Sequence, residues 1–531
     1  MTSARSRAVV LLLALAGAAI ARFIAWRALG DVPHVMDEVA YDLQAKTFGE
    51  GALALPVRLP RGAFTTWFVD DRTETFSIFP PGWPALLAPF AKLGLRAWVN
   101  PALHALTTFV VGAIGRRLGG PRARLFAAGA WALSPQAIVL AASLMSHTLV
   151  AAAASIVVLA ALSRRAWLEV AGGAALGVLV LTRPLCAVSI AGALVLVLVV
   201  RRRRVRLADL ARFAAPVVVA LGLLAAYNHR LTGSATRFPQ TAFFDEHAPP
   251  LDDPFYTFGP GCNALGFGHA CDRGVANARH DLANAASNTG DNVTAWLLLA
   301  GGGPAAFLLT AWAIARAKRR RRLVLAAGAP VLISIVLYAL YWYAGTCFGA
   351  RFYHAAIPSL LALAGVGLSR VGPRVARAGV AAAAIAINAF VLVQSARELS
   401  GYWGTDARFA RLAEGWSESD ALVMVAFRRV ESPHTSYTWT SFLKDAHWRN
   451  DMRVHGALHA NRARLDGKVV FARFHPGLVR ALRARFPARE TWLYVLDADD
   501  TSRDSLARYD GAQSDPPPKD NFGACVVPAA P

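Results

Sequence analysis

The chain has few cysteines and few charged residues for its length, and both shortages restrict what it can be. Five cysteines in 531 residues are too few for a disulfide scaffold. Charged residues make up only 17% of the chain and hydrophobic residues 55%, so a single soluble core cannot enclose the apolar surface. Nucleotide-binding signatures are missing too: there is no glycine-rich phosphate loop and no Walker lysine. The composition therefore predicts a polytopic membrane protein.

Two of the five cysteines, Cys262 and Cys271, lie close together in one polar loop. If that loop is outside the cytoplasm, a local disulfide can form there. Two unpaired thiols are the alternative, and the spacing does not decide between them.

Long apolar runs supply the main structural signal. A run of about nineteen residues crosses a bilayer core of roughly 30 Å as a helix. The sequence contains about eleven such candidate spans, at about 8–26, 97–115, 124–142, 147–163, 167–181, 185–200, 212–227, 293–315, 323–343, 354–369 and 376–395.

Basic residues set the predicted orientation. Arg5 and Arg7 precede the first span, and the other dense basic clusters all fall in every second connection between spans. Such clusters favour the cytoplasmic side. The net charge of +22 is therefore explained by topology, and nucleic-acid binding is disfavoured. The clustered residues are Arg116, Arg117, Arg122, Arg124, Arg164, Arg165, Arg201 to Arg204, Arg206, Arg316, Lys318 to Arg322, Arg370, Arg374 and Arg377.

This topology divides the chain into two predicted domains. Residues 1–395 form a mainly helical transmembrane bundle with outward loops at about 27–96 and 228–292. Residues 396–531 form a small extracytoplasmic α/β domain, because strand-like runs at 421–427, 468–474 and 491–496 alternate with basic helical stretches. We expect a multi-pass protein of the plasma (inner) membrane with a cytoplasmic N-terminus.

An acidic pair stands just outside the first span. A carboxylate at the outer mouth of a helical bundle, such as Asp37, can act as a general base that takes a proton from an acceptor. Alternatively, Asp37 or Glu38 simply caps the helix that begins there and favours its positive end. Spacing alone does not separate these two interpretations.

Two short strings resemble a known enzyme superfamily. Met-Asp-Glu-Val-Ala-Tyr at 36–41 follows the first span, and Phe-Pro-Pro-Gly-Trp-Pro at 79–84 leads into apolar residues. Together with the topology, they resemble the GT-C membrane glycosyltransferases, in the branch of glycosyltransferase family 39, the protein O-mannosyltransferases and the lipid A aminoarabinose transferases. The resemblance covers about residues 1–395.

The resemblance implies a mechanism and a donor. It carries the catalytic base onto Asp37, with Glu38 as its neighbour, and implies a sugar on a polyprenyl phosphate as donor. One position departs from the family pattern: many relatives have His or Lys before the paired prolines, whereas this chain has Phe79. Phosphate or acceptor contacts made from that position elsewhere are therefore in doubt here.

A phosphate leaving group needs cationic or hydrogen-bonding side chains at the outer helix ends. Arg183, His147, Arg351 and His354 occupy such ends, and Tyr41 follows the acidic pair. We interpret them as contacts to the donor phosphate or sugar. Each also has a simpler interpretation: arginines at helix ends extend to lipid headgroups, and lone histidines are common polar residues at the interface.

A metal site has weaker support. The second outward loop carries several histidines and acids, but their spacing matches no known ligand pattern. We therefore assign no metal ligands and no certain cofactor apart from the lipid-linked sugar, and a divalent metal stays an open alternative without support. The loop residues concerned are His229, Asp245, Glu246, His247, Asp252, Asp253, His269, Asp272 and His280.

The sequence thus predicts an inverting glycosyltransferase of the cell envelope. It moves a hexosyl or pentosyl unit from a polyprenyl-phosphate donor to a glycan, lipid or protein acceptor at the outer membrane face, with Asp37 as general base. The first alternative is an oligosaccharide polymerase or ligase, whose activity would reside in the 228–292 loop. A transporter or flippase ranks last, because the spans carry almost no ionisable residues at their centres and show no repeat symmetry.

Overall fold

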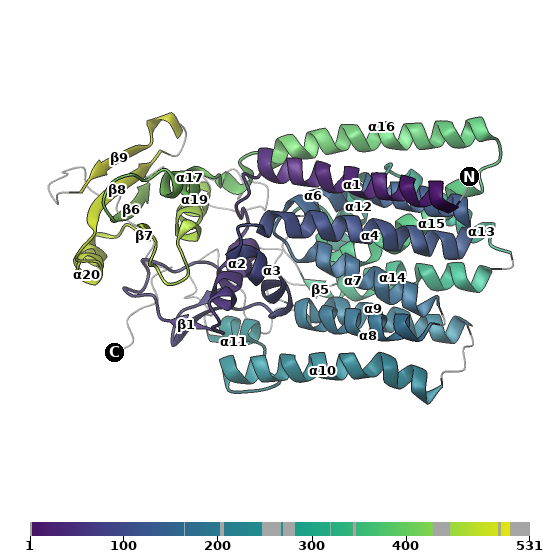
Figure 1. Ribbon diagram of the computed structural model, residues 1–531, viewed down its shortest axis with the longest axis horizontal. Coiled ribbons are helices and arrows are strands. Elements are labelled where there is room, and N and C mark those ends of the chain that lie inside the picture. The colour runs from purple at the N-terminus through teal and green to yellow at the C-terminus, as the bar shows by residue number, and fades with distance from the viewer. Residues whose placement is uncertain are drawn as a thin grey trace.

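The computed structural model describes residues 3–246 except 164 and 202–205, residues 267–268, and residues 282–509 except 319, 343–346, 428–445 and 498–500. The molecule is elongated. A bundle of helices fills one end and a sheet with its helices fills the other, as Figure 1 shows. The N-terminus lies at the far end of the bundle.

Six helices in the described part are long and apolar enough to cross a membrane. They are α1 (Ser3–Arg27), α4 (Arg96–Gly119), α10 (Leu207–Thr232), α14 (Arg321–Ala339), α15 (Ile357–Ser369) with the preceding short helix η1 (Arg351–Ala356), and α16 (Arg374–Leu399). A bent pair makes a seventh if it is counted as one span: α5 (Pro121–Ala132) and α6 (Pro135–Ala142). Shorter helices complete the bundle: α7 (His147–Ala161), α8 (Ala166–Thr182), α9 (Pro184–Arg201), α12 (Leu282–Leu299) and α13 (Ala305–Ala315).

The predicted count of about eleven spans is not supported, although every predicted run overlaps a helix. Two runs are broken. The run at 124–142 bends by 50° between α5 and α6, where Ser134 caps α6 by accepting a hydrogen bond from the Ala137 amide and Pro135 lacks an amide hydrogen. The run at 293–315 is interrupted by Gly301, Gly302 and Gly303, which all have positive φ.

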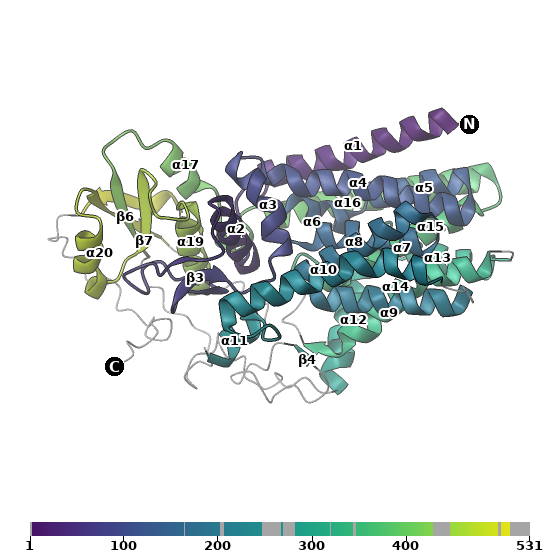
Figure 2. The same ribbon diagram turned by 60° about the horizontal axis from the view of Figure 1, so that its bottom comes forward.

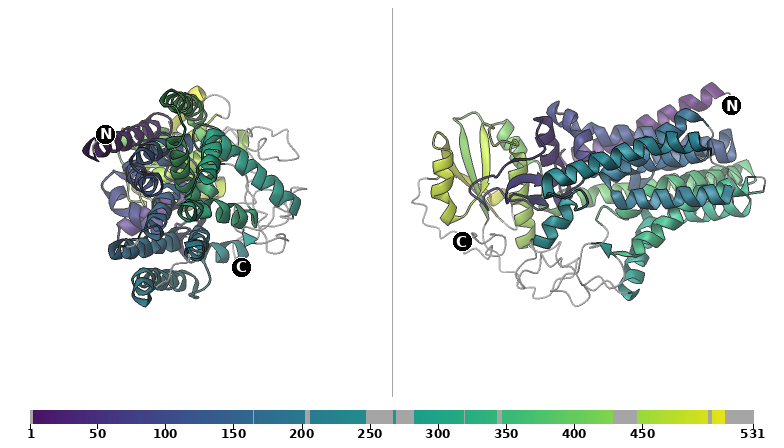
Figure 3. Two further views of the ribbon diagram at one scale, coloured as in Figure 1. Left: turned by 90° about the vertical axis from the view of Figure 1, so that its right-hand side faces the viewer. Right: turned by 90° about the horizontal axis from the view of Figure 1, so that it is seen from below.

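Small residues let the helices approach closely, as is common in membrane bundles. A Cβ added at Gly173 of α8 would lie within 3.0 Å of the Phe213 carbonyl of α10, and one at Gly367 of α15 would meet the Leu309 carbonyl of α13 in the same way. The segment Arg351–Ser369 lies at the centre of the bundle, since 94% of its apolar stretch is buried. The apolar stretch of α16 lies at the edge, since only 6% of it is buried. The end-on view in Figure 3 shows the helices packed side by side.

The basic connections gather at the end of the bundle that holds the N-terminus (Figure 1). Arg320 donates a hydrogen bond of 2.7 Å to the Arg117 carbonyl, which joins two of the predicted basic clusters. Arg370 donates to the Ala313 carbonyl nearby. This clustering agrees with one cytoplasmic face, while the orientation itself remains a prediction.

The first outward segment lies at the opposite end of the bundle. It contains α2 (Met36–Gly49), α3 (Gly82–Lys92) and three short antiparallel strands, β1 (Leu55–Pro56), β2 (Val69–Asp70) and β3 (Glu74–Ser77), in the order β1-β3-β2. Figure 2 shows α2 and α3 between the bundle and the sheet region. This segment therefore touches both parts of the molecule.

The C-terminal part contains a four-stranded sheet of order β7-β6-β8-β9. The three predicted strands are confirmed as β6 (Ala421–Phe427), β7 (Val469–Arg473) and β8 (Glu490–Leu496), which pair in parallel, and β9 (Ser505–Arg508) adds an antiparallel edge. The helices α17 (Arg408–Glu414), α19 (Ala446–Ala460) and α20 (Val479–Arg485) lie around the sheet.

The core of this α/β part is not built from the C-terminal residues alone. Ala63 and Phe64 of the first outward segment are buried in it, and the Arg473 amide donates a hydrogen bond of 2.8 Å to the Ala63 carbonyl. A boundary at 395/396 remains a prediction, but the packing shows that the two parts share a piece of chain.

Candidate active site at the outer end of the bundle

The acidic pair at the start of α2 divides into two different environments. Glu38 is buried, with 1% of its surface exposed. One carboxylate oxygen accepts a hydrogen bond of 2.6 Å from the Leu144 amide, and the other accepts from the amides of His34 and Val35 at 2.8 and 3.2 Å. Glu38 thus caps α2 and ties it to the α6–α7 connection. Its carboxylate is directed at backbone amides, so the structure does not bring it together with the predicted donor contacts.

Burial also changes the acidity of Glu38. Removal of the carboxyl from water raises its pKa to about 7, while the three backbone hydrogen bonds act in the opposite direction.

Asp37, in contrast, faces a predicted donor contact. Its Oδ2 lies 3.8 Å from Nη1 of Arg351, and the two side chains are 17% and 16% exposed. Arg351 comes from η1, more than 300 residues further along the chain. The Nε and Nη1 atoms of Arg351 are buried without a hydrogen-bond partner among the described residues. A long ion pair with unused donors is a site prepared for another anionic group.

The backbone before η1 fixes the place of Arg351. Phe348 and Gly349 both have positive φ, of 54° and 72°. Gln136 of α6 donates a hydrogen bond of 2.6 Å to the Phe348 carbonyl. A Cβ at residue 349 would collide with the side chains of Gln136 and Leu299, so this turn favours glycine both by its positive φ and by its close contacts.

Arg183 joins Arg351 at a shared aromatic ring. It lies in the short connection between α8 and α9, and its guanidinium carbon is 5.3 Å from the ring centroid of Phe352. The guanidinium carbon of Arg351 is 5.1 Å from the same centroid. Two cations thus gather at one ring with a single close carboxylate, that of Asp37, among the described residues. This excess positive charge favours an anionic ligand.

His147 and Tyr41 complete the cluster. The His147 ring packs edge-on against Phe352 at 6.4 Å, and both its nitrogens are buried without a partner in the described chain. The Tyr41 hydroxyl lies 3.5 Å from Ser146 Oγ. Burial raises the pKa of Tyr41 to about 12, and the positive charge of Arg183 partly opposes this. The structure therefore brings together Asp37, Tyr41, His147, Arg183 and Arg351.

His354 does not join this cluster. It points into the bundle, where its ring packs against Trp131 at 5.6 Å. This geometry adds no support to its predicted role as a donor contact, because its ring lies beside a buried tryptophan of α5.

The sequence did not predict the group of aromatic rings formed by Phe352, Tyr338 and Tyr341. The rings of Tyr338 and Tyr341 each lie 5.7 Å from that of Phe352. Burial raises the pKa of Tyr341 to about 12, against the opposing charges of Arg183 and Arg351. Only the adjacency of Phe352 to Arg351 in the sequence could have pointed to this ring.

The residue that departs from the family pattern has a packing role. Phe79 is buried, and its ring lies 4.7 Å from that of Tyr41. The following α3 is anchored by Trp83, whose indole nitrogen donates a hydrogen bond of 2.8 Å to the Leu144 carbonyl. The string at 79–84 therefore shapes the wall behind Tyr41.

Among the described residues, no group of three or more His, Cys, Asp or Glu side chains could hold a metal ion. Most of the loop residues considered for a metal, as well as Cys262 and Cys271, lie outside the described residues.

No protein-family model and no curated protein sequence matches this chain. Solved structures do. ArnT from Cupriavidus metallidurans, bound to undecaprenyl phosphate, matches with a TM-score of 0.53 and 14% identity over 91% of this chain and 92% of that one. Its apo state also matches with a TM-score of 0.53, over 93% and 94% of the two chains. This chain has a GT-C fold.

A GT-C fold agrees with the expectation from the acidic motif and the topology. The oligosaccharyltransferase of Archaeoglobus fulgidus is a weaker likeness, with a TM-score of 0.48, 15% identity and coverage of 77% of this chain and 56% of that one. At 14% identity the likeness to ArnT establishes the fold alone, and the activity must be argued from the site.

Proposed function

We propose that this protein is an inverting glycosyltransferase that takes a sugar from a polyprenyl-phosphate donor. The observation that supports this most directly is the cluster of Arg183 and Arg351 at Phe352, with Asp37 beside Arg351. The C. metallidurans ArnT of the same fold binds undecaprenyl phosphate. A lipid phosphate is an anion that matches two neighbouring guanidinium groups, one of which, that of Arg351, has donors without a partner among the described residues.

In the proposed reaction, Asp37 takes a proton from the acceptor hydroxyl or amine. The acceptor oxygen or nitrogen attacks the anomeric carbon as the bond to the phosphate oxygen breaks on the opposite face, so the configuration inverts. Arg351 and Arg183 bind the departing phosphate and stabilise the negative charge that develops on it. His147 supplies a further hydrogen bond to the phosphate or the sugar, and Tyr41 lines the site.

The acceptor is a glycan, lipid or protein of the envelope, and the reaction takes place at the outer face of the plasma membrane. The bundle of residues 1–395 carries the chemistry, and residues 396–531 form the extracytoplasmic part. The basic end of the bundle supports this orientation because arginine clusters are retained in the cytoplasm.

The first test compares wild type with Asp37→Asn. The amide keeps the shape of the side chain but cannot accept the proton, so transfer of sugar from a polyprenyl-phosphate donor should fall at least about 100-fold. Binding of undecaprenyl phosphate should persist. Asp209→Asn is a matched control, because Asp209 pairs with Arg212 at the other end of the bundle.

A second arm tests the phosphate contacts. Arg351→Ala should weaken binding of undecaprenyl phosphate about 10- to 100-fold, the usual value of a charge-assisted hydrogen bond or two. Normal turnover by Asp37→Asn would refute the proposed mechanism, and would favour an oligosaccharide polymerase or ligase if substitutions in the 228–292 loop removed activity instead.

A further inference from the structure

The helix that carries Asp37 has a second charged side chain with no part in the proposed chemistry. Asp42 is fully buried, with 0% of its side chain exposed. Three groups from three elements surround its carboxylate: Lys46 of α2 at 2.9 Å, Arg96 of α4 at 3.1 Å, and Nδ1 of His459 of α19 at 3.3 Å. Asp42 therefore sits where the outward segment, the bundle and the α/β part meet.

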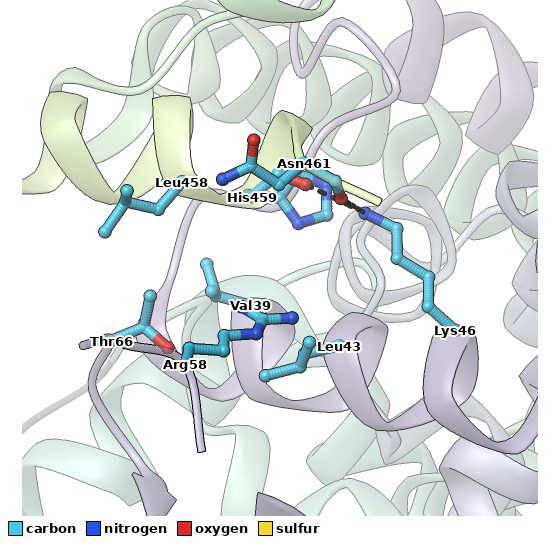
Figure 4. Close-up of a pocket in the computed structure, with 8 residues that line it drawn as sticks. All are labelled: Val39, Leu43, Lys46, Arg58, Thr66, Leu458, His459 and Asn461. Carbon is cyan, nitrogen blue, oxygen red and sulfur yellow. Dashed lines mark hydrogen bonds between the residues drawn. The ribbon is translucent and has the colours of Figure 1, made fainter. Parts of the chain in front are cut away.

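Lys46 extends this junction to the backbone of the α/β part. Its Nζ donates hydrogen bonds to the carbonyls of His459, at 2.8 Å, and Asn461, at 3.3 Å. Figure 4 shows the Lys46 side chain reaching from α2 to the end of α19. Because these carbonyls end a helix, they carry partial negative charge that favours an ammonium group.

The first outward segment makes another contact with the α/β part, next to Lys46. Arg58 donates a hydrogen bond of 3.0 Å to the Ala463 carbonyl. Arg58 and Thr66 line a small hollow together with Lys46 and His459 (Figure 4). Polar and charged contacts therefore cross this boundary beside the apolar ones made by Ala63 and Phe64.

Asp37 and Lys46 lie on opposite faces of α2. They are nine residues apart, which is about two and a half turns of an α-helix. One face of α2 therefore presents the proposed base to Arg351, while the other is held by the α/β part. Any rotation or shift of α2 that loosens the second face moves Asp37 on the first.

We propose that Lys46 and Asp42 are positioning residues, through which the α/β part sets the place of α2 and hence the distance between Asp37 and Arg351. This inference rests on the proposed function. Its physical basis is that a buried carboxylate left without its partners is strongly unfavourable, so the four groups hold one arrangement. In such sites an error of about 1 Å in the reacting geometry costs about 100-fold in rate.

The test is Lys46→Met, which keeps an unbranched side chain one atom shorter and removes the ammonium. The kcat for sugar transfer should fall about 10- to 100-fold. The KM for the donor should change less than about threefold, because Arg183 and Arg351 do not belong to α2. Lys46→Arg, which can still donate to both carbonyls, should recover most of the rate.

A matched control lies at the same boundary. Arg464 of the α/β part pairs with Glu50 just after α2, but this ion pair is exposed, at 53% and 31%. Arg464→Met should leave kcat within about twofold of wild type, because exposed ion pairs contribute little.

Two further readouts separate positioning from loss of folding and from failure of the proposed function. Undecaprenyl phosphate should bind Lys46→Met with wild-type stoichiometry, whereas a merely destabilised protein would show fewer sites. Backbone hydrogen exchange in residues 39–49 should rise in Lys46→Met and not in Arg464→Met, whatever reaction the protein catalyses. Unchanged exchange in α2, or a wild-type kcat for Lys46→Met in an active enzyme, would overturn the proposal. Inactivity of the wild type together with the expected exchange pattern would refute only the proposed function.

Discussion

The adjacent acids Asp37 and Glu38 have different surroundings. Glu38 is buried and accepts hydrogen bonds from three backbone amides. Asp37 is half-buried and lies near one cationic side chain, that of Arg351. Of the two interpretations that spacing left open, the helix cap describes Glu38. The role of Asp37 as the base stays a prediction, and its position beside Arg351 is compatible with it.

The raised pKa of Glu38 predicts a dependence of stability on pH. The folded protein holds this proton up to about pH 7, while the unfolded chain releases it near its ordinary value of 4.5. Stability should therefore decrease as pH rises from about 4.5 to about 7, by about 3 kcal/mol from this group. Glu38→Gln should remove that slope.

Thermal unfolding of detergent-purified wild type and Glu38→Gln between pH 5 and 8 measures this effect. The difference between the two curves isolates Glu38, since every other group titrates in both. The variant should also be less stable at pH 5, because a side-chain amide cannot accept hydrogen bonds on both sides. A constant difference across this range would contradict the prediction.

At this scale the sequence located most of the candidate site. The acidic pair and the arginines at helix ends were found because their residue types are unusual where apolar spans end. Phe352 was missed, since an aromatic residue at such a position is ordinary. The contact of His354 with Trp131 was not predictable either, because it joins segments that are far apart in the chain.

Among the elements, η1 depends on the tight turn that precedes it. Gly349 has a φ of 72°, and a Cβ there would collide with Gln136. Gly349→Ala should therefore displace Arg351 and lower transfer at least about 10-fold. Gly401 is a matched control, since it has a φ of 68° and nothing within 4 Å of an added Cβ.

In Gly401→Ala only backbone strain of about 1–2 kcal/mol applies, so its activity should stay within about twofold of wild type once folded. Activity assays and donor-binding measurements on both variants check this. Equal loss in the two variants would show that positive φ, rather than contact with Gln136, limits the site.

Helices were predictable from apolar runs, and strands from β-branched and aromatic runs. The predicted run at 468–474 differs from β7 by one residue at each end. The breaks inside runs were harder, because a proline or a glycine triplet can bend a span without lowering its hydrophobicity. The number of spanning helices therefore differed from eleven, even though each run was helical.

For the whole molecule, the gathering of basic connections at one end predicts the orientation in the membrane. Residues at that end should face the cytoplasm, and the sheet should face outward. Single cysteines at the exposed positions Ala4 and Ser417 test this. A membrane-impermeant maleimide should label Ser417→Cys in intact cells.

Ala4→Cys should react only after the membrane is opened, with the unmodified protein as background control. The reverse pattern would place Asp37 in the cytoplasm and remove the proposed donor. The asymmetry of the basic residues allowed this orientation to be predicted from the sequence. The burial of Ala63 and Phe64 in the α/β core could not be predicted, because this contact joins segments that are far apart in the chain.

The anchorage of Lys46 on carbonyl oxygens has a consequence for how this chain can diverge over evolutionary time. Every amino acid carries a carbonyl, so this contact does not constrain which side chains occupy positions 459 and 461. A substitution at either position would therefore leave the carbonyl contact of the lysine in place. Methods that infer contacts from correlated substitutions would then overlook this connection.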